Sequence, residues 1–175
     1  MDKKYSRIHT LAFGAVFAAL ITVTTAFVKI PTPMGYIHAG DALVFLTAII
    51  VPPPFCFIAA AIGGALADLL AGYAVWAIPT AVIKALNVLP FVIAKKILNR
   101  NNKPYAIFSV PMILAVIISC AVTVAGYFFA NCLLYDYAAA WAEVPFNLVQ
   151  SAVGAVLFAV AALALKALRY ERWHL

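Results

Sequence analysis

Apolar stretches separated by short polar or proline-containing breaks run along almost the whole chain. Six of them predict helices, at residues 8–28, 41–51, 54–70, 77–98, 105–134 and 145–168. A helix needs about 20 apolar residues to cross a hydrocarbon core about 30 Å thick, so the second stretch is short for a spanning segment. Pro52, Pro53 and Pro54 separate the second stretch from the third, because proline breaks a helix. The pattern therefore predicts an all-α fold.

The composition places these helices in a membrane. Of the 175 residues, 67% are hydrophobic and 10% are charged, and a soluble chain of this length cannot bury that much apolar surface. The first stretch stays apolar from Leu11 to Val28, which is longer than the apolar part of a typical signal peptide, so we expect a retained helix. The sequence thus predicts an integral membrane protein with a single domain over residues 1–175.

The basic residues decide between topologies with five and six crossings. If all six stretches cross, the N-terminus, the loop at 95–103 and the C-terminus lie on one side and carry ten of the twelve Lys and Arg residues. Cytoplasmic segments of membrane proteins are enriched in Lys and Arg. We therefore predict six transmembrane helices with both termini cytoplasmic, in a multi-pass protein of the bacterial plasma membrane. This placement accounts for the net charge of +6 without nucleic acid as a partner.

Polar side chains gather in the half of the helices that this topology places outside. A charge within a bilayer costs about 3 kcal/mol on insertion scales, so Asp68 and Lys84 either form an ion pair between neighbouring helices or line a pocket. Helical spacing adds further polar residues at this depth, on three helix faces: Asn87, Thr123, Tyr127, Asn131, Asn147 and Gln150. One such stripe fits hydrogen bonding between helices. Three stripes at one depth predict a ligand pocket.

Aromatic residues at the same level divide into two groups. The residues predicted to stack on a flat heteroaromatic ligand in the pocket are Tyr36, Tyr73 and Trp76. The residues that fit an aromatic belt at the membrane surface are Tyr135, Tyr137 and Trp141.

The stretch GYIHAGDALVF, residues 35–45, interrupts the apolar pattern before the second helix. Gly35 and Gly40 are expected to permit tight backbone turns. Asp41 fits the N-cap or the first turn of the second helix, where its charge meets the positive end of the helix dipole. Tyr36 and His38 are then left to face the pocket, and the loop is predicted to act as its lid.

Several classes of site are missing from the sequence. The three cysteines, Cys56, Cys120 and Cys132, lie far apart in apolar surroundings, so they indicate neither a disulfide nor a metal site. No P-loop, H-E-x-x-H or G-x-S-x-G motif occurs. The chain is therefore predicted to be no enzyme, to hold no cofactor or metal, and to lack an energy source of its own.

Three motifs resemble the substrate-binding S components of energy-coupling factor (ECF) vitamin transporters. They are Gly35-Tyr36 with Gly40-Asp41-Ala42, then Ala67-Asp68-Leu69 with Gly72-Tyr73, and finally Pro79 and Thr80 with Lys84. The turn from Val51 to Phe55, with its three prolines, departs from the Gly-Pro turn expected of that family. The resemblance covers residues 12–90 in motif and the whole chain in topology.

The resemblance implies a site near the external face for a vitamin, capped by the loop between the first two helices. It also implies partners: a transmembrane coupling subunit and, through it, two ATPase subunits that drive uptake. The small residues Ala15 and Ala19, spaced as Ala-x-x-x-Ala, fit close helix packing either within the protein or on a partner subunit. They also match the pattern by which this family docks on the coupling subunit.

The nature of the vitamin is narrowed by charge. The outer half carries Lys29 and Lys84 against four acids, so a strongly anionic cargo is disfavoured. Among the cargoes that the resemblance implies, pyridoxine or the hydroxymethylpyrimidine precursor of thiamine is favoured, and riboflavin and thiamine stay as alternatives. A stand-alone secondary carrier or channel is the rival class of protein, although no internal repeat of the kind such carriers show is visible.

Overall fold

The computed structural model describes residues 7–100 and 108–167. Its elements are, in order, α1 Arg7–Phe27, β1 Lys29–Pro31, β2 Tyr36–His38, α2 Asp41–Ile50, α3 Phe55–Ala71, the 3-10 turn η1 Ala74–Trp76, α4 Ala77–Arg100, α5 Val110–Leu134 and α6 Tyr137–Ala167. The predicted all-α architecture is confirmed, with one small addition: β1 and β2 form an antiparallel hairpin that the hydrophobic pattern did not reveal.

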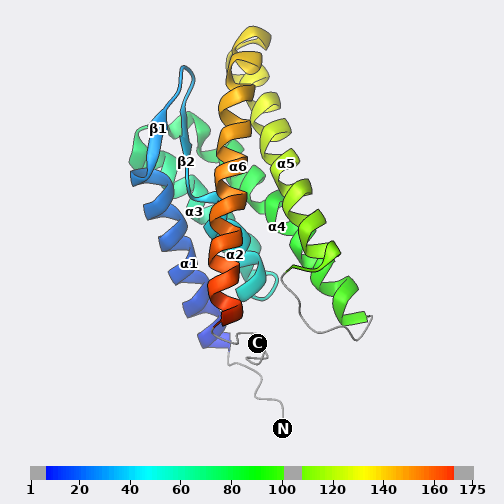
Figure 1. Ribbon diagram of the computed structural model, residues 1–175. Coiled ribbons are helices and arrows are strands. Elements are labelled where there is room, and N and C mark those ends of the chain that lie inside the picture. Colours follow the sequence, from blue (N-terminus) through cyan, green and yellow to red (C-terminus); the bar gives the residue numbers. More distant parts are fainter. Residues whose placement is uncertain (1–6, 101–107, 168–175) are drawn as a thin grey trace.

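The six helices form a bundle (Figure 1). α1 packs on α3, α3 on α4, α4 on α5 and α5 on α6, while α2 packs against both α4 and α6. Figure 1 shows the hairpin at one end of the bundle, with the start of α1 and the end of α6 at the opposite end. The bundle thus has a hairpin end and an opposite end at which α1 begins and α6 ends (Figure 1).

Four helices of the described residues are long and apolar enough to cross a bilayer: Ile8–Phe27, Ala74–Asn99, Val110–Leu134 and Tyr137–Leu165. α2 and α3 are shorter apolar helices. The sixth helix begins at Tyr137 and not at residue 145, because the Asp136 carboxylate accepts a hydrogen bond from the Ala139 N–H at 2.7 Å and caps the helix start. The predicted fifth helix begins within residues 101–107, outside the described residues, and α5 is described from Val110.

α2 is the central helix, and it is held along its length by other helices. Its ten residues rise only about 15 Å, yet seven of them are buried. In its middle, the ring of Phe45 lies 5.1 Å from Phe91 of α4 and 5.7 Å from Phe158 of α6. At its end, the Lys95 ammonium donates to the carbonyls of Ala48 and Ile49 at 3.2 and 2.9 Å. A short helix is stable here because protein, not lipid, surrounds it.

Gly63 and Gly40 are among the glycines that close approach between elements requires. A Cβ at Gly63 of α3 would lie 2.8 Å from the Cβ of Ile21 in α1, and the Thr22 hydroxyl of α1 donates to the Gly63 carbonyl at 3.0 Å. A Cβ at Gly40 would lie 2.0 Å from Thr25 Oγ1. Gly40 stands at a turn, as predicted, but its ordinary φ of −64° does not itself require glycine. The space beside Thr25 is what demands glycine there.

The contact between α1 and α3 yields a test of packing. Gly63→Ala should lower the free energy of unfolding by about 1–3 kcal/mol, because the added methyl group overpacks against Ile21. Gly14→Ala in α1 is the matched control, since its Cβ would lie 3.8 Å from Phe55, an ordinary contact. Thermal melting of both purified variants in detergent checks this, and equal melting temperatures would contradict it.

Candidate functional site

A polar cavity lies beneath the hairpin, between the helices at that end of the bundle. Its lining residues are Gly35, Tyr36, His38, Asp68, Trp76, Thr80, Tyr127, Asn131, Glu143 and Asn147. The cavity has about 360 Å³ of empty volume with its open mouth included, but the centres of water molecules fit in only about 30 Å³ of it. A substituted aromatic ring is much larger than the few waters that such a space holds. Entry of a ring therefore requires a lining segment to move.

The hairpin covers the cavity and is fastened to α6 at its tip. The Glu143 carboxylate accepts hydrogen bonds from the Thr32 hydroxyl at 2.9 Å and from the Met34 N–H at 3.0 Å. The Trp76 indole N–H donates to the Met34 carbonyl at 3.0 Å. Glu143 also lines the cavity. The same carboxylate therefore contacts both the cover and the space beneath it.

Tyr36 connects the hairpin to α3. Its hydroxyl donates to Asp68 Oδ1 at 2.6 Å, and burial, followed by this hydrogen bond, raises the pKa of Tyr36. Its ring lies 5.0 Å from the ring of Tyr73, and the Lys29 ammonium sits 5.0 Å from the centre of the Tyr36 ring. Tyr36 thus presents its hydroxyl end to the carboxyl group and its ring to the outer rim.

His38 is neutral at physiological pH. Burial, strengthened by the nearby Lys84 ammonium, lowers the pKa of His38 to about 3. Its Nδ1 accepts a hydrogen bond from the Gly40 N–H at 3.1 Å, so the single proton of the neutral ring resides on Nε2. His38 therefore enters the cavity lining as an uncharged ring with one fixed donor.

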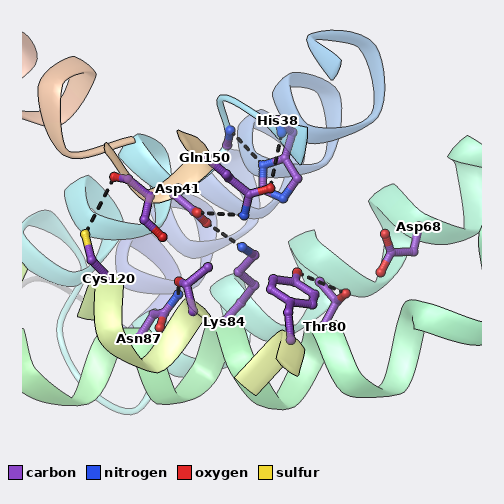
Figure 2. Close-up of polar contacts among 12 residues, drawn as sticks. His38, Asp41, Asp68, Thr80, Lys84, Asn87, Cys120 and Gln150 are labelled. Carbon is purple, nitrogen blue, oxygen red and sulfur yellow. Dashed lines mark hydrogen bonds and ion pairs between the residues drawn. The ribbon is translucent and has the colours of Figure 1, made fainter. Parts of the chain in front are cut away.

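A buried ion pair lies next to the cavity, outside its lining. The Lys84 ammonium of α4 pairs with Asp41 Oδ1 at the start of α2, and both side chains are fully buried. Gln150 of α6 donates to Asp41 Oδ2 at 3.0 Å, and its Oε1 accepts a hydrogen bond from the His38 N–H at 3.3 Å. Figure 2 shows these side chains converging from the hairpin and three helices.

This network corrects one expectation and decides between the two alternatives of another. Lys84 pairs with Asp41, so the predicted alternative of an ion pair between Asp68 and Lys84 was wrong. Asp41 does lie in the first turn of α2, but Gly40 is the N-cap residue and no side chain caps the helix. The Asp41 carboxylate pairs with the Lys84 ammonium and does not cap the helix, because a buried charge needs an opposite charge beside it.

Of the twelve residues predicted to bind substrate, seven line the cavity: Tyr36, His38, Asp68, Trp76, Tyr127, Asn131 and Asn147. The five that do not are Asp41, Tyr73, Lys84, Asn87 and Gln150. Asn87 instead donates to the Thr123 hydroxyl at 2.8 Å and joins α4 to α5, as the alternative of helix–helix hydrogen bonding predicts. Tyr73 lies at the rim beside Tyr36.

Two polar residues of the lining, Thr80 and Glu143, were not predicted from the sequence as site residues. Thr80 stands one turn before Lys84 and shares a hydrogen bond with the Tyr127 hydroxyl at 3.2 Å. Glu143 lies in the predicted external loop between residues 134 and 145, and it entered the sequence analysis only as one of the four acids of the outer half. The early start of α6 brings Glu143 onto a helix facing the cavity. Its position between Trp141 and Pro145 carries no motif that would have singled it out.

Residues 7–100 and 108–167 contain no group of three or more His, Cys, Asp or Glu side chains arranged to hold a metal ion. The carboxyl groups near the cavity are engaged with the Tyr36 hydroxyl, with Lys84 and with the hairpin tip. Such an arrangement is suited to holding a small polar molecule through hydrogen bonds and ring contacts.

The sequence of a known protein family matches almost the entire chain. The family described as "ECF-type riboflavin transporter, S component" matches residues 5–167. The chain belongs to this family. Its members are transporter components of membranes, so the S-component family is not a family of enzymes.

Two individual proteins are similar to this S-component family member. A protein of Pyrococcus woesei described as "Uncharacterized protein in gap 3'region" is 32% identical over 140 residues, covering 78% of this chain and 88% of the relative. A solved structure described as "Structure and mechanism of the S component of a bacterial ECF transporter" has a TM-score of 0.72 at 19% identity, covering 93% of this chain and 98% of that one. The latter shows that the bundle has the S-component fold.

The buried ion pair leads to a prediction about stability. Lys84→Gln should lower the free energy of unfolding by about 3–5 kcal/mol, because it leaves the Asp41 carboxylate buried without a cation. The double variant Lys84→Gln with Asp41→Asn should recover much of this loss, since both charges are then gone. Thermal melting in detergent measures both, and a double variant no more stable than the single one would contradict the pairing.

Proposed function

We propose that this protein is the substrate-binding component of an ECF transporter that takes up a small water-soluble vitamin or precursor. Pyridoxine or hydroxymethylpyrimidine is the favoured cargo, held beneath the hairpin. The observation that carries the proposal is a polar cavity, lined by aromatic rings and two carboxyl groups, at one end of an S-component bundle. Such a combination of apolar ring faces and a few placed polar groups is typical of sites for small heteroaromatic ligands.

The charge of the lining supports this class of cargo. Among the described residues that line the cavity, Asp68 and Glu143 are acidic and none is Lys or Arg. Lys84 is occupied by Asp41, and Lys29 lies over the rings of Tyr36 and Tyr73. An anionic cargo would meet like charge without a compensating cation. Riboflavin, which the family description names, is the alternative cargo, and thiamine is a further one.

The proposal includes a topology and a set of partners. All six helices cross the plasma membrane of a bacterium, the hairpin end faces outward, and both termini are cytoplasmic. The common position of the start of α1 and the end of α6 supports an even number of crossings (Figure 1). A coupling subunit in the membrane and two ATPase subunits supply the energy, and α1 docks on the coupling subunit through Ala15 and Ala19.

Reconstitution tests the dependence on partners. Liposomes containing this chain with a coupling subunit and two ATPase subunits should accumulate radiolabelled pyridoxine or hydroxymethylpyrimidine only when ATP is enclosed, because the chain has no energy source of its own. The chain alone should bind the vitamin without accumulating it. Accumulation by the chain alone, without ATP, would favour a stand-alone secondary carrier and contradict the proposal.

The proposed docking surface can be tested separately. Ala15 and Ala19 are exposed on α1, so Ala15→Leu and Ala19→Leu should abolish ATP-driven uptake by preventing close helix approach, while ligand binding stays unchanged. Ala121→Leu is the matched control, because it adds the same bulk to an exposed alanine of α5. Loss of binding in step with uptake would show that these alanines serve the fold and not a partner.

A further inference from the structure

Two buried oxygen atoms of the cavity residues accept no hydrogen bond from any described residue. They are Asp68 Oδ2 and Asn131 Oδ1. The rest of each group is engaged: Asp68 Oδ1 accepts the Tyr36 hydroxyl at 2.6 Å, and Asn131 Nδ2 donates to the Tyr127 carbonyl at 2.9 Å. Asp68 and Asn131 are 3% and 1% exposed. A buried polar atom without a partner is costly, so such atoms point to a missing one.

The hydrogen bonds already made determine what the free atoms can do. The short distance from the Tyr36 hydroxyl to Asp68 Oδ1 is typical of an O–H group donating to an ionised carboxylate. Asp68 Oδ2 is then an acceptor with negative charge, with the Thr80 hydroxyl beside the same carboxyl group. Since Asn131 Nδ2 is held by Tyr127, its Oδ1 is fixed as an acceptor too.

We propose that the cargo is a heteroaromatic ring, uncharged or positively charged, that donates hydrogen bonds to Asp68 Oδ2 and Asn131 Oδ1. This inference rests on the proposed function and narrows its substrate class by hydrogen-bond polarity. The cargo carries amino, hydroxyl or protonated ring N–H groups at two points and no phosphate or carboxylate. Tyr36 is a positioning residue, because its hydroxyl decides which Asp68 oxygen faces the cargo.

Equilibrium binding to the purified full chain in detergent tests the substrate class. The panel pairs pyridoxine with pyridoxal 5′-phosphate and 4-pyridoxate, and riboflavin with its 5′-phosphate, and adds hydroxymethylpyrimidine and thiamine. The tightest ligand should lack phosphate and carboxylate, and adding either group should weaken binding by about 100-fold or more, because like charges then meet in a closed site. A phosphate or carboxylate form that binds as tightly as its parent overturns the proposal.

Asp68→Asn tests the polarity of the site with almost no change in shape. The amide oxygen of the asparagine stays available to the Tyr36 hydroxyl, so the amide nitrogen, a donor, takes the place of the charged acceptor Oδ2. Affinity for the tightest ligand should therefore fall about 10- to 100-fold. Asp136→Asn is the matched control: it removes one negative charge from an exposed helix cap outside the lining, so affinity should stay within about 3-fold, a ratio of under 1 kcal/mol. Equal affinity of wild type and Asp68→Asn overturns the proposal.

Variants at Asn131 test the proposal independently, even if the Asp68→Asn variant does not fold. Asn131→Gln keeps both an amide donor for the Tyr127 carbonyl and an acceptor oxygen, so it should retain more binding than Asn131→Leu, which removes both and should weaken binding about 10-fold. Equal effects of the two changes overturn the proposal. If the folded wild type binds no compound of the panel, the proposed vitamin transport itself fails. If the wild type binds one compound and the changes at Asp68 and Asn131 leave that affinity unaltered, only the inference about hydrogen-bond polarity fails.

Discussion

The buried ion pair between Asp41 and Lys84 is the constraint around which the hairpin end of the bundle is organised. Two charges without access to water must stay together, so the start of α2 is held at one position on α4. Gln150 extends this connection to α6 and to the backbone of His38. Hydrophobic contacts tolerate small shifts of one helix along another, whereas a buried ion pair requires its two groups to stay in contact. The pair thus sets the position of the hairpin relative to three helices.

The cavity exists because the hairpin is held above the helices by polar contacts at both ends. At its base, the Gly40 N–H donates to His38 Nδ1, and the glycine passes close to Thr25. At its tip, Glu143 accepts hydrogen bonds from Thr32 and Met34. Hydrogen bonds of this kind are each worth about 1–3 kcal/mol net, so the tip can be released without disturbing the aromatic core around Phe45. A small closed cavity and a releasable cover are compatible with a site that admits its cargo by moving the hairpin.

Charge is distributed so that the cavity keeps its negative potential. The two cations nearest to it are already engaged, Lys84 by Asp41 and Lys29 by the rings of Tyr36 and Tyr73. The acids of the lining are left to define its polarity, and two acceptor atoms of lining residues have no hydrogen-bond partner among the described residues. Because the nearby cations are already paired and two acceptor oxygens are not, the site should select a cargo that donates hydrogen bonds.

The order of apolar stretches by itself determined the six helices, and the spacing of Tyr127 and Asn131 placed both on the face that lines the cavity. These features follow from local periodicity and burial, which a single sequence carries. The partner of Lys84 was decided by tertiary structure, because Asp41 and Asp68 both lie before it in sequence and only packing of α2 against α4 brings Asp41 to the ammonium. Glu143 likewise became a cavity residue only once Asp136 had begun α6 early and the hairpin had folded over it. Helices are local, whereas the pairing of buried charges depends on which helices meet.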